Sequence, residues 1–220
     1  MSATPKWHRA IANALAKSNN SNFIQLATIT SGRPAVRTVV VRDFIIPVSR
    51  PSRPLLLATT DIRMPKVAEL VANMNVGCTW WISETREQFR IRGVAKIWKK
   101  TCLCSARKPP AKDNFNWENK AVEVFRNMSP GMKASWCLPT PGTPLDTHPD
   151  SPPDSWPTRI VDPEEGDKQN RENWNRSLSR FALLLIEPSG VDYVELAVAP
   201  NKRTKFWLQG GKWHDQACVP

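Results

Sequence analysis

The stretch Arg37-Thr38-Val39-Val40-Val41-Arg42 places three consecutive valines between two arginines. Three valines after a threonine favour a β-strand, because β-branched side chains fit a pleated surface better than a helix. A strand this apolar is expected to be buried, yet a buried guanidinium group needs an anionic partner to offset its desolvation. Two interpretations follow. The arginines reach solvent at the ends of a core strand, or the strand grips an anionic ligand such as a phosphate.

The residues around this stretch predict an antiparallel, strand-rich fold. Residues 23–30 and 35–44 are expected to pair as a hairpin across a tight turn at 31–34. Other strands are expected at 55–59, 76–83, 88–99, 181–186, 191–198, 204–208 and 213–220, with turns at 188–190 and 209–211. About eight strands, mostly linked as hairpins, favour a mainly β (α+β) class: an antiparallel barrel with peripheral helices.

Two or three helices are expected beside these strands. Segment 5–18 has apolar residues at helical spacing, with Thr4 as the expected N-cap. These apolar residues are Trp7, Ile11, Ala14 and Leu15. Segments 65–74 and 115–127 predict two more helices with one apolar face each.

Residues 139–168 differ from the rest of the chain. They contain eight prolines and several acidic residues, without a sustained apolar period. This composition predicts a long, partly mobile surface excursion. The strand-rich pattern resumes after the excursion, so we expect a single domain over residues 1–220 rather than two domains and a linker.

Composition and charge narrow the classes of function. The chain contains 40% hydrophobic residues. It has no apolar run long enough for a membrane span, and its start lacks the apolar core of a secretion signal. The net charge of +11 suits nucleic acid, an acidic membrane face or phosphorylated small molecules. The basic residues are spread along the chain, which argues against nucleic acid, although the ten tryptophans leave a stacking barrel as an alternative.

Cysteine usage indicates a reducing compartment. The five cysteines are odd in number and scattered, which is typical of free thiols in a cytoplasmic protein. Cys102 and Cys104 are closely spaced, but two thiols without a nearby histidine make a poor metal site. We therefore expect no metal.

The turn before the second predicted helix is a candidate phosphate site. Thr59 and Thr60 supply hydroxyls, Arg63 and Lys66 supply cations, and a helix N-terminus supplies free amides. The plainer interpretation is an ordinary helix start, capped by Thr60 or Asp61, with a solvated lysine. Under the first interpretation, Arg37 from the neighbouring hairpin converges on the same phosphate and its charge is compensated.

Gln88 is a third candidate, because a side-chain amide both donates and accepts hydrogen bonds and can read the edge of a heterocycle. It opens an apolar strand, where a glutamine is otherwise an unremarkable edge residue.

Four motifs resemble those of the pyridoxamine 5′-phosphate oxidase family, the flavin mononucleotide (FMN) split barrels. Residues 37–42 are similar to the family's Arg-x-Val-Leu-x-Lys strand, and residues 59–66 to its Tyr-Thr-Asn turn and the basic pair that follows. Residues 85–90 are similar to a Glu-Arg-Gln segment. Residues 139–142 resemble a Pro-x-Pro-Gly segment of the oxidase-like FMN-binding branch.

The resemblance implies an antiparallel split β-barrel, FMN as cofactor, a small-molecule substrate and a homodimer in which two subunits build each site. By position, it implies that Arg37 and Lys66 hold the FMN phosphate. The other residues that it places at the cofactor are Thr38, Val39, Val40, Arg42, Thr59, Thr60, Arg63, Gln88 and either Arg203 or Lys205. It does not identify a catalytic acid or base.

The implied activity is hydride transfer between a small substrate and flavin N5, as in oxidation of pyridoxamine or pyridoxine 5′-phosphate. The family's Arg-Leu-His substrate motif near the C-terminus is not legible here, where residues 200–205 read Pro-Asn-Lys-Arg-Thr-Lys. An alternative therefore stays open: an FMN-binding reductase or tailoring oxidoreductase for a non-pyridoxal metabolite.

Overall fold

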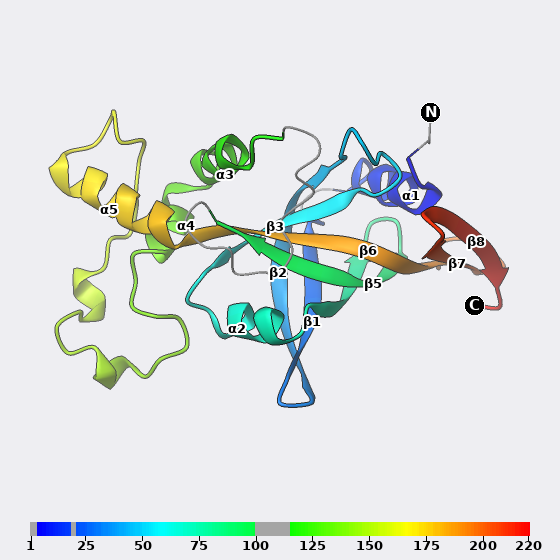
Figure 1. Ribbon diagram of the computed structural model, residues 1–220, viewed down its shortest axis with the longest axis horizontal. Coiled ribbons are helices and arrows are strands. Elements are labelled where there is room, and N and C mark those ends of the chain that lie inside the picture. The colour runs from blue at the N-terminus through cyan, green and yellow to red at the C-terminus, as the bar shows by residue number, and fades with distance from the viewer. Residues whose placement is uncertain (1–3, 19–20, 100–114) are drawn as a thin grey trace.

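Eight antiparallel strands organise the chain in the computed structural model, which describes residues 4–18, 21–99 and 115–220 (Figure 1). The strands are β1 (Phe23–Thr30), β2 (Arg33–Ile45), β3 (Leu55–Asp61), β4 (Asn75–Ile82), β5 (Glu87–Trp98), β6 (Phe181–Glu195), β7 (Lys202–Gln209) and β8 (Lys212–Cys218). Their order in the sheet is β3-β2-β1-β4-β5-β6-β7-β8, and β3 also pairs with β6. This last pairing joins six strands into a hydrogen-bonded ring, and β7 and β8 continue beyond it. The predicted mainly β class is confirmed.

The predicted hairpin around the opening stretch is present. Strand β1 pairs antiparallel with β2, with Leu26 opposite Arg37 and Phe23 opposite Val40. The turn uses left-handed backbone at Ser31 and Gly32 (φ 49° and 73°), which Gly32 adopts without a steric penalty.

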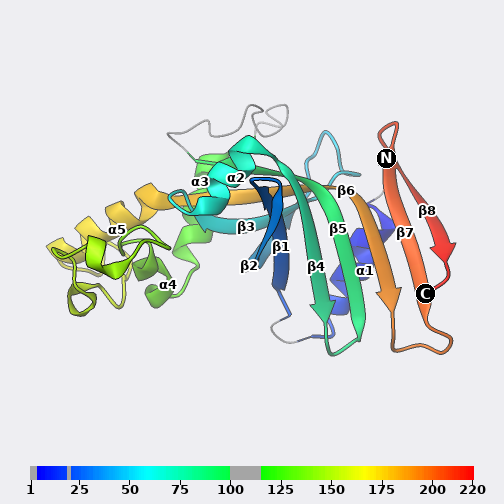
Figure 2. The ribbon, with the colours of Figure 1, turned by 90° about the horizontal axis from the view of Figure 1, so that it is seen from below.

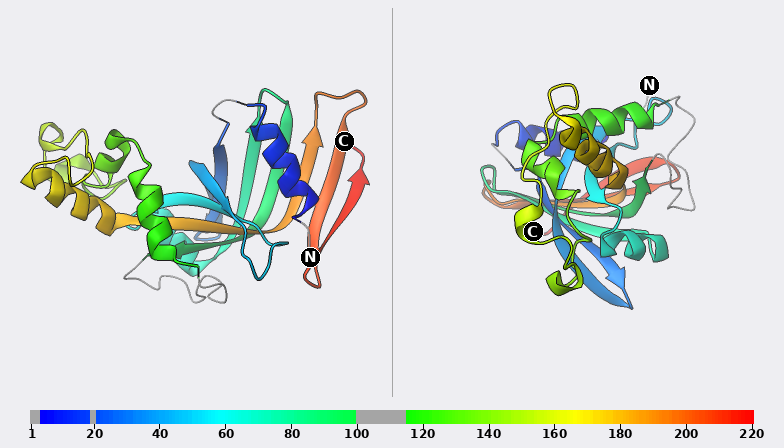
Figure 3. Two further views of the ribbon diagram at one scale, coloured as in Figure 1. Left: turned by 90° about the horizontal axis from the view of Figure 1, so that it is seen from above. Right: turned by 90° about the vertical axis from the view of Figure 1, so that its left-hand side faces the viewer.

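The described helices are α1 (Lys6–Leu15), α2 (Pro65–Ala72), α3 (Trp117–Arg126), α4 (Pro130–Ser135) and α5 (Lys168–Arg180), with short 3₁₀ helices η2 (Leu145–Thr147) and η3 (Pro153–Ser155). Four of these five α-helices lie at the two ends of the sheet, and α2 packs beside β1 and β5. Helices α3, α4 and α5 gather at one end as a helical lobe, defined as residues 117–180, and α1 lies across the sheet at the other end (Figures 1 and 3). Strand β6 runs directly out of α5 into the sheet (Figure 2).

Strands β3 and β6 are buried on both faces, which explains their continuous apolar sequence. Leu56 and Ala58 of β3 face the core inside the ring, where they join Trp7 and Ile11 of α1. The alternating Leu55 and Leu57 face a second core in the helical lobe. In that core, Phe125 packs edge-on against Trp136, Trp174 and Phe181 at ring separations of 4.9–6.2 Å.

The turn predicted at residues 188–190 is wrong. Strand β6 passes unbroken through residues 188–190, where a turn was predicted, and the irregularity is a bulge against β5 between Arg92 and Gly93. A Cβ on Gly93 would lie 2.2 Å from the Glu187 carbonyl oxygen, so only glycine fits this close approach. The strand therefore accommodates Pro-Ser-Gly at residues 188–190 through a bulge in its pairing with β5, and the chain does not reverse direction there.

The predicted N-caps are also wrong. Helix α1 begins after Pro5 with no side-chain cap, so Thr4 does not cap it. Helix α2 begins after Met64, again without a side-chain cap, so neither Thr60 nor Asp61 caps it. Asp61 instead accepts a hydrogen bond from the Arg63 backbone N–H at 2.8 Å.

The proline-rich segment is largely exposed and is organised locally. It carries η2 and η3 and ends at Asp167, whose side chain caps α5. In the described part of the chain, no helix is long and apolar enough to cross a membrane.

Candidate functional site

A cleft of about 500 Å³ lies between the ring of strands and the helical lobe. Strands β2 and β3 and the start of α2 contribute one set of lining residues, and α4 with the proline-rich segment contributes the other. Seven residues predicted to bind the cofactor line it, namely Thr38, Val39, Val40, Arg42, Thr59, Thr60 and Lys66. The middle of β2, the end of β3 and the turn into α2 thus bring two predicted motifs to one place.

Two cations in this cleft lack an anionic partner among the described residues. Lys66 is 8% exposed, and its Nζ contacts the Met64 sulfur at 2.7 Å. Arg42 contacts the Met132 sulfur at 2.8 Å through Nη2, and its Nε is buried without a hydrogen-bond partner in the described chain. A thioether sulfur is a weak acceptor, so both charges remain poorly compensated.

The electrostatic state of Lys66 reflects this environment. Burial, together with the nearby Arg37 guanidinium, lowers the pKa of Lys66 to about 8, against a smaller opposing effect of Asp61 and Glu69. Burial also lowers the pKa of Arg42. A cleft that holds desolvated cations favours an anionic ligand, since the anion restores the interactions that water no longer provides.

Arg37 is engaged elsewhere in this structure. Its Nη2 forms an ion pair with Glu69 of α2 at 2.8 Å, and its Nη1 donates to the Thr28 hydroxyl and to the Ala35 carbonyl. Glu69 is therefore the anionic partner that the sequence required for this arginine. Arg37 does not line the cleft, although its charge acts on Lys66.

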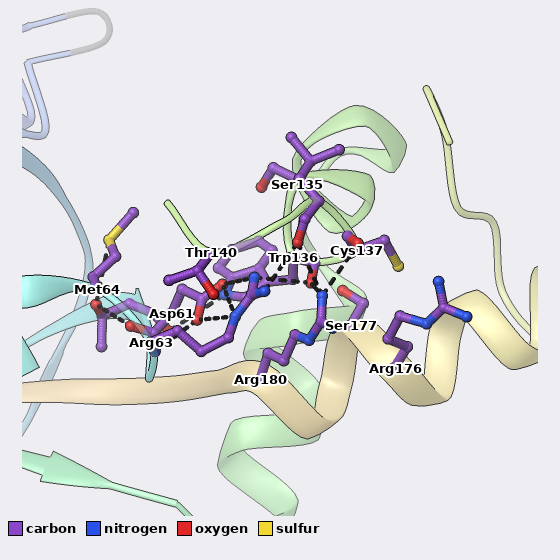
Figure 4. A network of polar contacts seen from close by, with 12 residues as sticks. Asp61, Arg63, Met64, Ser135, Trp136, Cys137, Thr140, Arg176, Ser177 and Arg180 are labelled. Atoms are coloured by element: carbon purple, nitrogen blue, oxygen red, sulfur yellow. Dashed lines mark hydrogen bonds and ion pairs between the residues drawn. The ribbon is translucent and has the colours of Figure 1, made fainter. Parts of the chain in front are cut away.

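Arg63 does not line the cleft either. It pairs with Asp61 at 2.5 Å, and its Nη1 donates to the Leu138 carbonyl at 2.9 Å. Arg180 at the end of α5 donates to the same carbonyl and to those of Trp136 and Cys137, at 2.9–3.1 Å. The two arginines form a clamp on residues 136–138, the start of the proline-rich wall (Figure 4).

The remaining predicted residues lie outside the cleft. Gln88 accepts a hydrogen bond from Arg90 at 2.7 Å, and Arg203 pairs with Asp192 at 2.7 Å. Lys205 lines a second depression across strands β1, β4, β5, β6, β7 and β8, together with Arg90. Within one copy of the chain, these residues are not brought to the cleft.

Sequence reasoning missed several lining residues. They are Met64, Met132, Ser135, Trp136, Leu145, His148 and Trp156. Helix α4, which carries Met132 and Ser135, was not predicted because it is only six residues long. Helix α5 was not predicted because its sequence is strongly polar. The Pro-Thr-Pro-Gly motif at 139–142 was the available signal, since all four residues line the cleft.

The described cysteines, Cys78, Cys137 and Cys218, are free, and no group of three or more potential metal ligands occurs in the described ranges. The prediction about Cys102 and Cys104 concerns residues outside those ranges.

Comparisons with known proteins agree with the geometry. A family model described as "Pyridoxamine 5'-phosphate oxidase, FMN-binding domain" matches residues 4–99. A curated Arabidopsis thaliana protein, pyridoxine/pyridoxamine 5′-phosphate oxidase 2, is 29% identical over 204 residues, which is 91% of this chain and 87% of that protein.

Solved structures show the same fold. A pyridoxamine 5′-phosphate oxidase-related, FMN-binding protein from Nostoc punctiforme is 26% identical, with a TM-score of 0.70 over 98% of both chains. PhzG from Burkholderia lata, solved with tetrahydrophenazine-1-carboxylic acid, is 18% identical, with a TM-score of 0.59 over 97% of this chain and 90% of its own.

The fold and the cation-lined cleft define a flavin-nucleotide-binding split-barrel protein. The resemblance seen in the sequence is confirmed: residues 4–99 match the FMN-binding domain model of the pyridoxamine 5′-phosphate oxidase family, and the cofactor of that domain is FMN.

Proposed function

We propose that this protein is an FMN-dependent oxidoreductase that exchanges a hydride between a small anionic substrate and flavin N5. The observation that carries the proposal is the pair of cleft cations, Arg42 and Lys66, without a carboxylate partner in the described chain. Bound FMN supplies two-electron hydride chemistry, while the protein supplies position and charge.

The residues of the cleft fit the two ends of a flavin nucleotide. Lys66 beside the hydroxyls of Thr59 and Thr60 suits a phosphate, since it combines a desolvated cation with short hydroxyl donors. Arg42, the next cation on β2, is left for a second anionic group, either of the flavin or of the substrate. Arg37 lies outside the cleft lining, where its ion pair with Glu69 holds it and its charge lowers the pKa of Lys66.

The substrate that we propose is pyridoxamine or pyridoxine 5′-phosphate, on the basis of the name of the Arabidopsis relative. The family's Arg-Leu-His substrate motif cannot be identified in this sequence. This favours the second candidate, a reductase or tailoring oxidoreductase that acts on another metabolite.

Anaerobic reduction of the purified, FMN-loaded protein distinguishes these functions. With pyridoxamine or pyridoxine 5′-phosphate, we expect the flavin's visible absorbance to bleach, and with NADPH we expect no change. Bleaching by NADPH alone would favour the reductase. A protein that neither retains nor rebinds FMN would contradict both candidates.

A further inference from the structure

The proline-rich segment forms part of the wall of the cleft. Residues 139–143, Leu145, His148 and Trp156 all line it, although much of the segment is exposed to solvent. A long segment placed at a ligand site by a rigid scaffold is a usual location of specificity. The sequence predicted a surface excursion here, without indicating whether it covers the site.

The wall is held in place by local hydrogen bonds. At its start, Arg63 and Arg180 clamp the carbonyls of residues 136–138. Within it, the Thr147 hydroxyl donates to the Pro144 carbonyl at 2.6 Å, and the His148 backbone N–H donates to the Leu145 carbonyl at 3.1 Å. The position of His148 is therefore set by the hydrogen bonds within the proline-rich segment.

The hydrogen bonds of Thr143 determine which imidazole nitrogen is left for a ligand. The Thr143 hydroxyl donates to the Thr140 carbonyl at 2.7 Å, so its oxygen is available only to accept. His148 Nε2 lies 2.7 Å from that oxygen, and we assign the ring proton to Nε2 because Thr143 has no second proton to donate. In the neutral ring, Nδ1 is then an acceptor, and it has no hydrogen-bond partner among the described residues.

His148 Nδ1 differs from the charged groups of this cleft, because it is an acceptor without a hydrogen-bond partner in the described chain. Lys66 and Arg42 offer only donors, and the Asp61 carboxylate is occupied by Arg63. The other two histidines lie elsewhere: His8 packs on Phe44, and His214 stacks on Trp207. The cleft cations therefore suit anionic groups, whereas His148 suits a hydrogen-bond donor on the substrate.

We infer that His148 is a specificity-determining residue, which accepts a hydrogen bond through Nδ1 from a hydroxyl or amino group of the substrate. This inference rests on the proposed function, because it concerns the substrate of the same cleft. Thr143 is a positioning residue, which keeps the proton on Nε2.

The test compares two ligands that differ in one donor group, pyridoxine 5′-phosphate and its 4-deoxy analogue. Calorimetric titration uses the FMN-loaded protein reduced with dithionite under anaerobic conditions, so that the alcohol is not oxidised. We expect wild type to bind the hydroxylated ligand about tenfold more tightly, the usual scale for one buried hydrogen bond. His148→Ala should bind both ligands equally.

The controls separate a direct contact from a structural effect. Asparagine places an oxygen near the position of Nδ1, so His148→Asn should restore most of the preference, while Thr143→Val should reduce it and His214→Ala should leave it unchanged. FMN affinity should stay within about twofold of wild type in all variants, since none of these side chains is a cation of the cleft.

An unchanged preference in His148→Ala, or a wild-type protein that binds neither ligand, would overturn the inference. Turnover of the oxidised protein is measured separately. A wild-type protein that shows the binding preference but oxidises neither pyridoxamine nor pyridoxine 5′-phosphate would contradict the proposed activity and support the role of His148.

Discussion

Lys66 is a buried lysine whose charged form is destabilised by the fold. Its pKa is lowered to about 8, mainly by burial, whereas the unfolded chain titrates at the ordinary value of 10.5. Between these two values the unfolded state binds more protons, so the free energy of unfolding rises with pH in this window. At neutral pH, the charge on Lys66 therefore costs stability in the ligand-free protein.

Lys66→Met tests this cost. At pH 7 the variant should melt about 2–4 °C above wild type without FMN, because it removes a desolvated charge and retains the packing. The difference should shrink as pH rises towards 10, where wild-type Lys66 is neutral. Differential scanning calorimetry at pH 7 and pH 10 measures both values. A variant that is less stable than wild type at pH 7 would show that the cation is compensated.

The same pKa predicts a pH dependence of FMN affinity. Protonated Lys66 attracts the phosphate dianion, so affinity should fall as pH rises through about 8. Flavin fluorescence titrations should give a dissociation constant about tenfold weaker at pH 9.5 than at pH 7 in wild type. In Lys66→Met, binding should be weaker throughout and nearly independent of pH over this range. An equally steep dependence in the variant would assign the titration to another group.

At the scale of elements, the arginine clamp joins the ring of strands to the helical lobe. Arg180 donates to three carbonyls at the end of α4, and Arg63 joins β3 to the same segment (Figure 4). Arg180→Ala leaves these carbonyls without their charged donor and should cost about 2 kcal/mol of the free energy of unfolding, since hydrogen bonds to charged groups contribute about 1.5–3 kcal/mol. Urea denaturation measures this change.

Arg176→Ala is the matched control, one helical turn earlier on α5, with a side chain directed away from the clamp (Figure 4). It removes the same charge and should change stability by less than about 0.5 kcal/mol. Equal destabilisation by both variants would mean that the clamp contributes nothing beyond helix propensity.

The elements also show where sequence reasoning succeeds and where it stops. Strand β1 and the β1–β2 hairpin were predictable, because alternating apolar residues and a glycine turn act locally. The cap of α2 was not, since Asp61 is drawn to Arg63, whose other partner is 75 residues away. Helix α5 was missed because its buried face is narrow, with Trp174 and Ser177 as its buried residues.

The candidate site divides in the same way. The motif positions on β2 and β3 that line the cleft were identified from residue types and a family resemblance. Arg37 was expected at the phosphate, but the sequence did not reveal that Glu69, 32 residues later, supplies its carboxylate. His148 had no recognisable motif, because only the folded proline-rich wall brings it to the cleft.

At the scale of the whole molecule, the second depression is the face on which we place a second copy. It carries Lys205 and Arg90, and Val36 at its edge is 64% exposed. Gly77 lies within it, and a Cβ there would meet open space. A second copy on this face would cover Lys205 and Arg90.

Gly77→Arg tests the dimer, because it adds a bulky charge to this face without a clash inside one copy. Light scattering after size exclusion should give a dimer for wild type and a monomer for the variant. Val71→Arg is the control, since Val71 is 60% exposed on α2 and does not line either depression. A wild-type monomer that binds FMN stoichiometrically would contradict a site built by two subunits.

The central claim is that the two uncompensated cations of the cleft hold the flavin nucleotide. The most direct test is FMN binding by Arg42→Ala/Lys66→Ala, beside Arg126→Ala/Lys168→Ala, which removes two exposed positive charges from the helical lobe. We predict that the cleft variant folds with an unchanged circular dichroism spectrum, purifies without flavin and binds FMN at least about 100-fold more weakly, while the control stays yellow. A cleft variant that purifies with the wild-type flavin content would contradict the account.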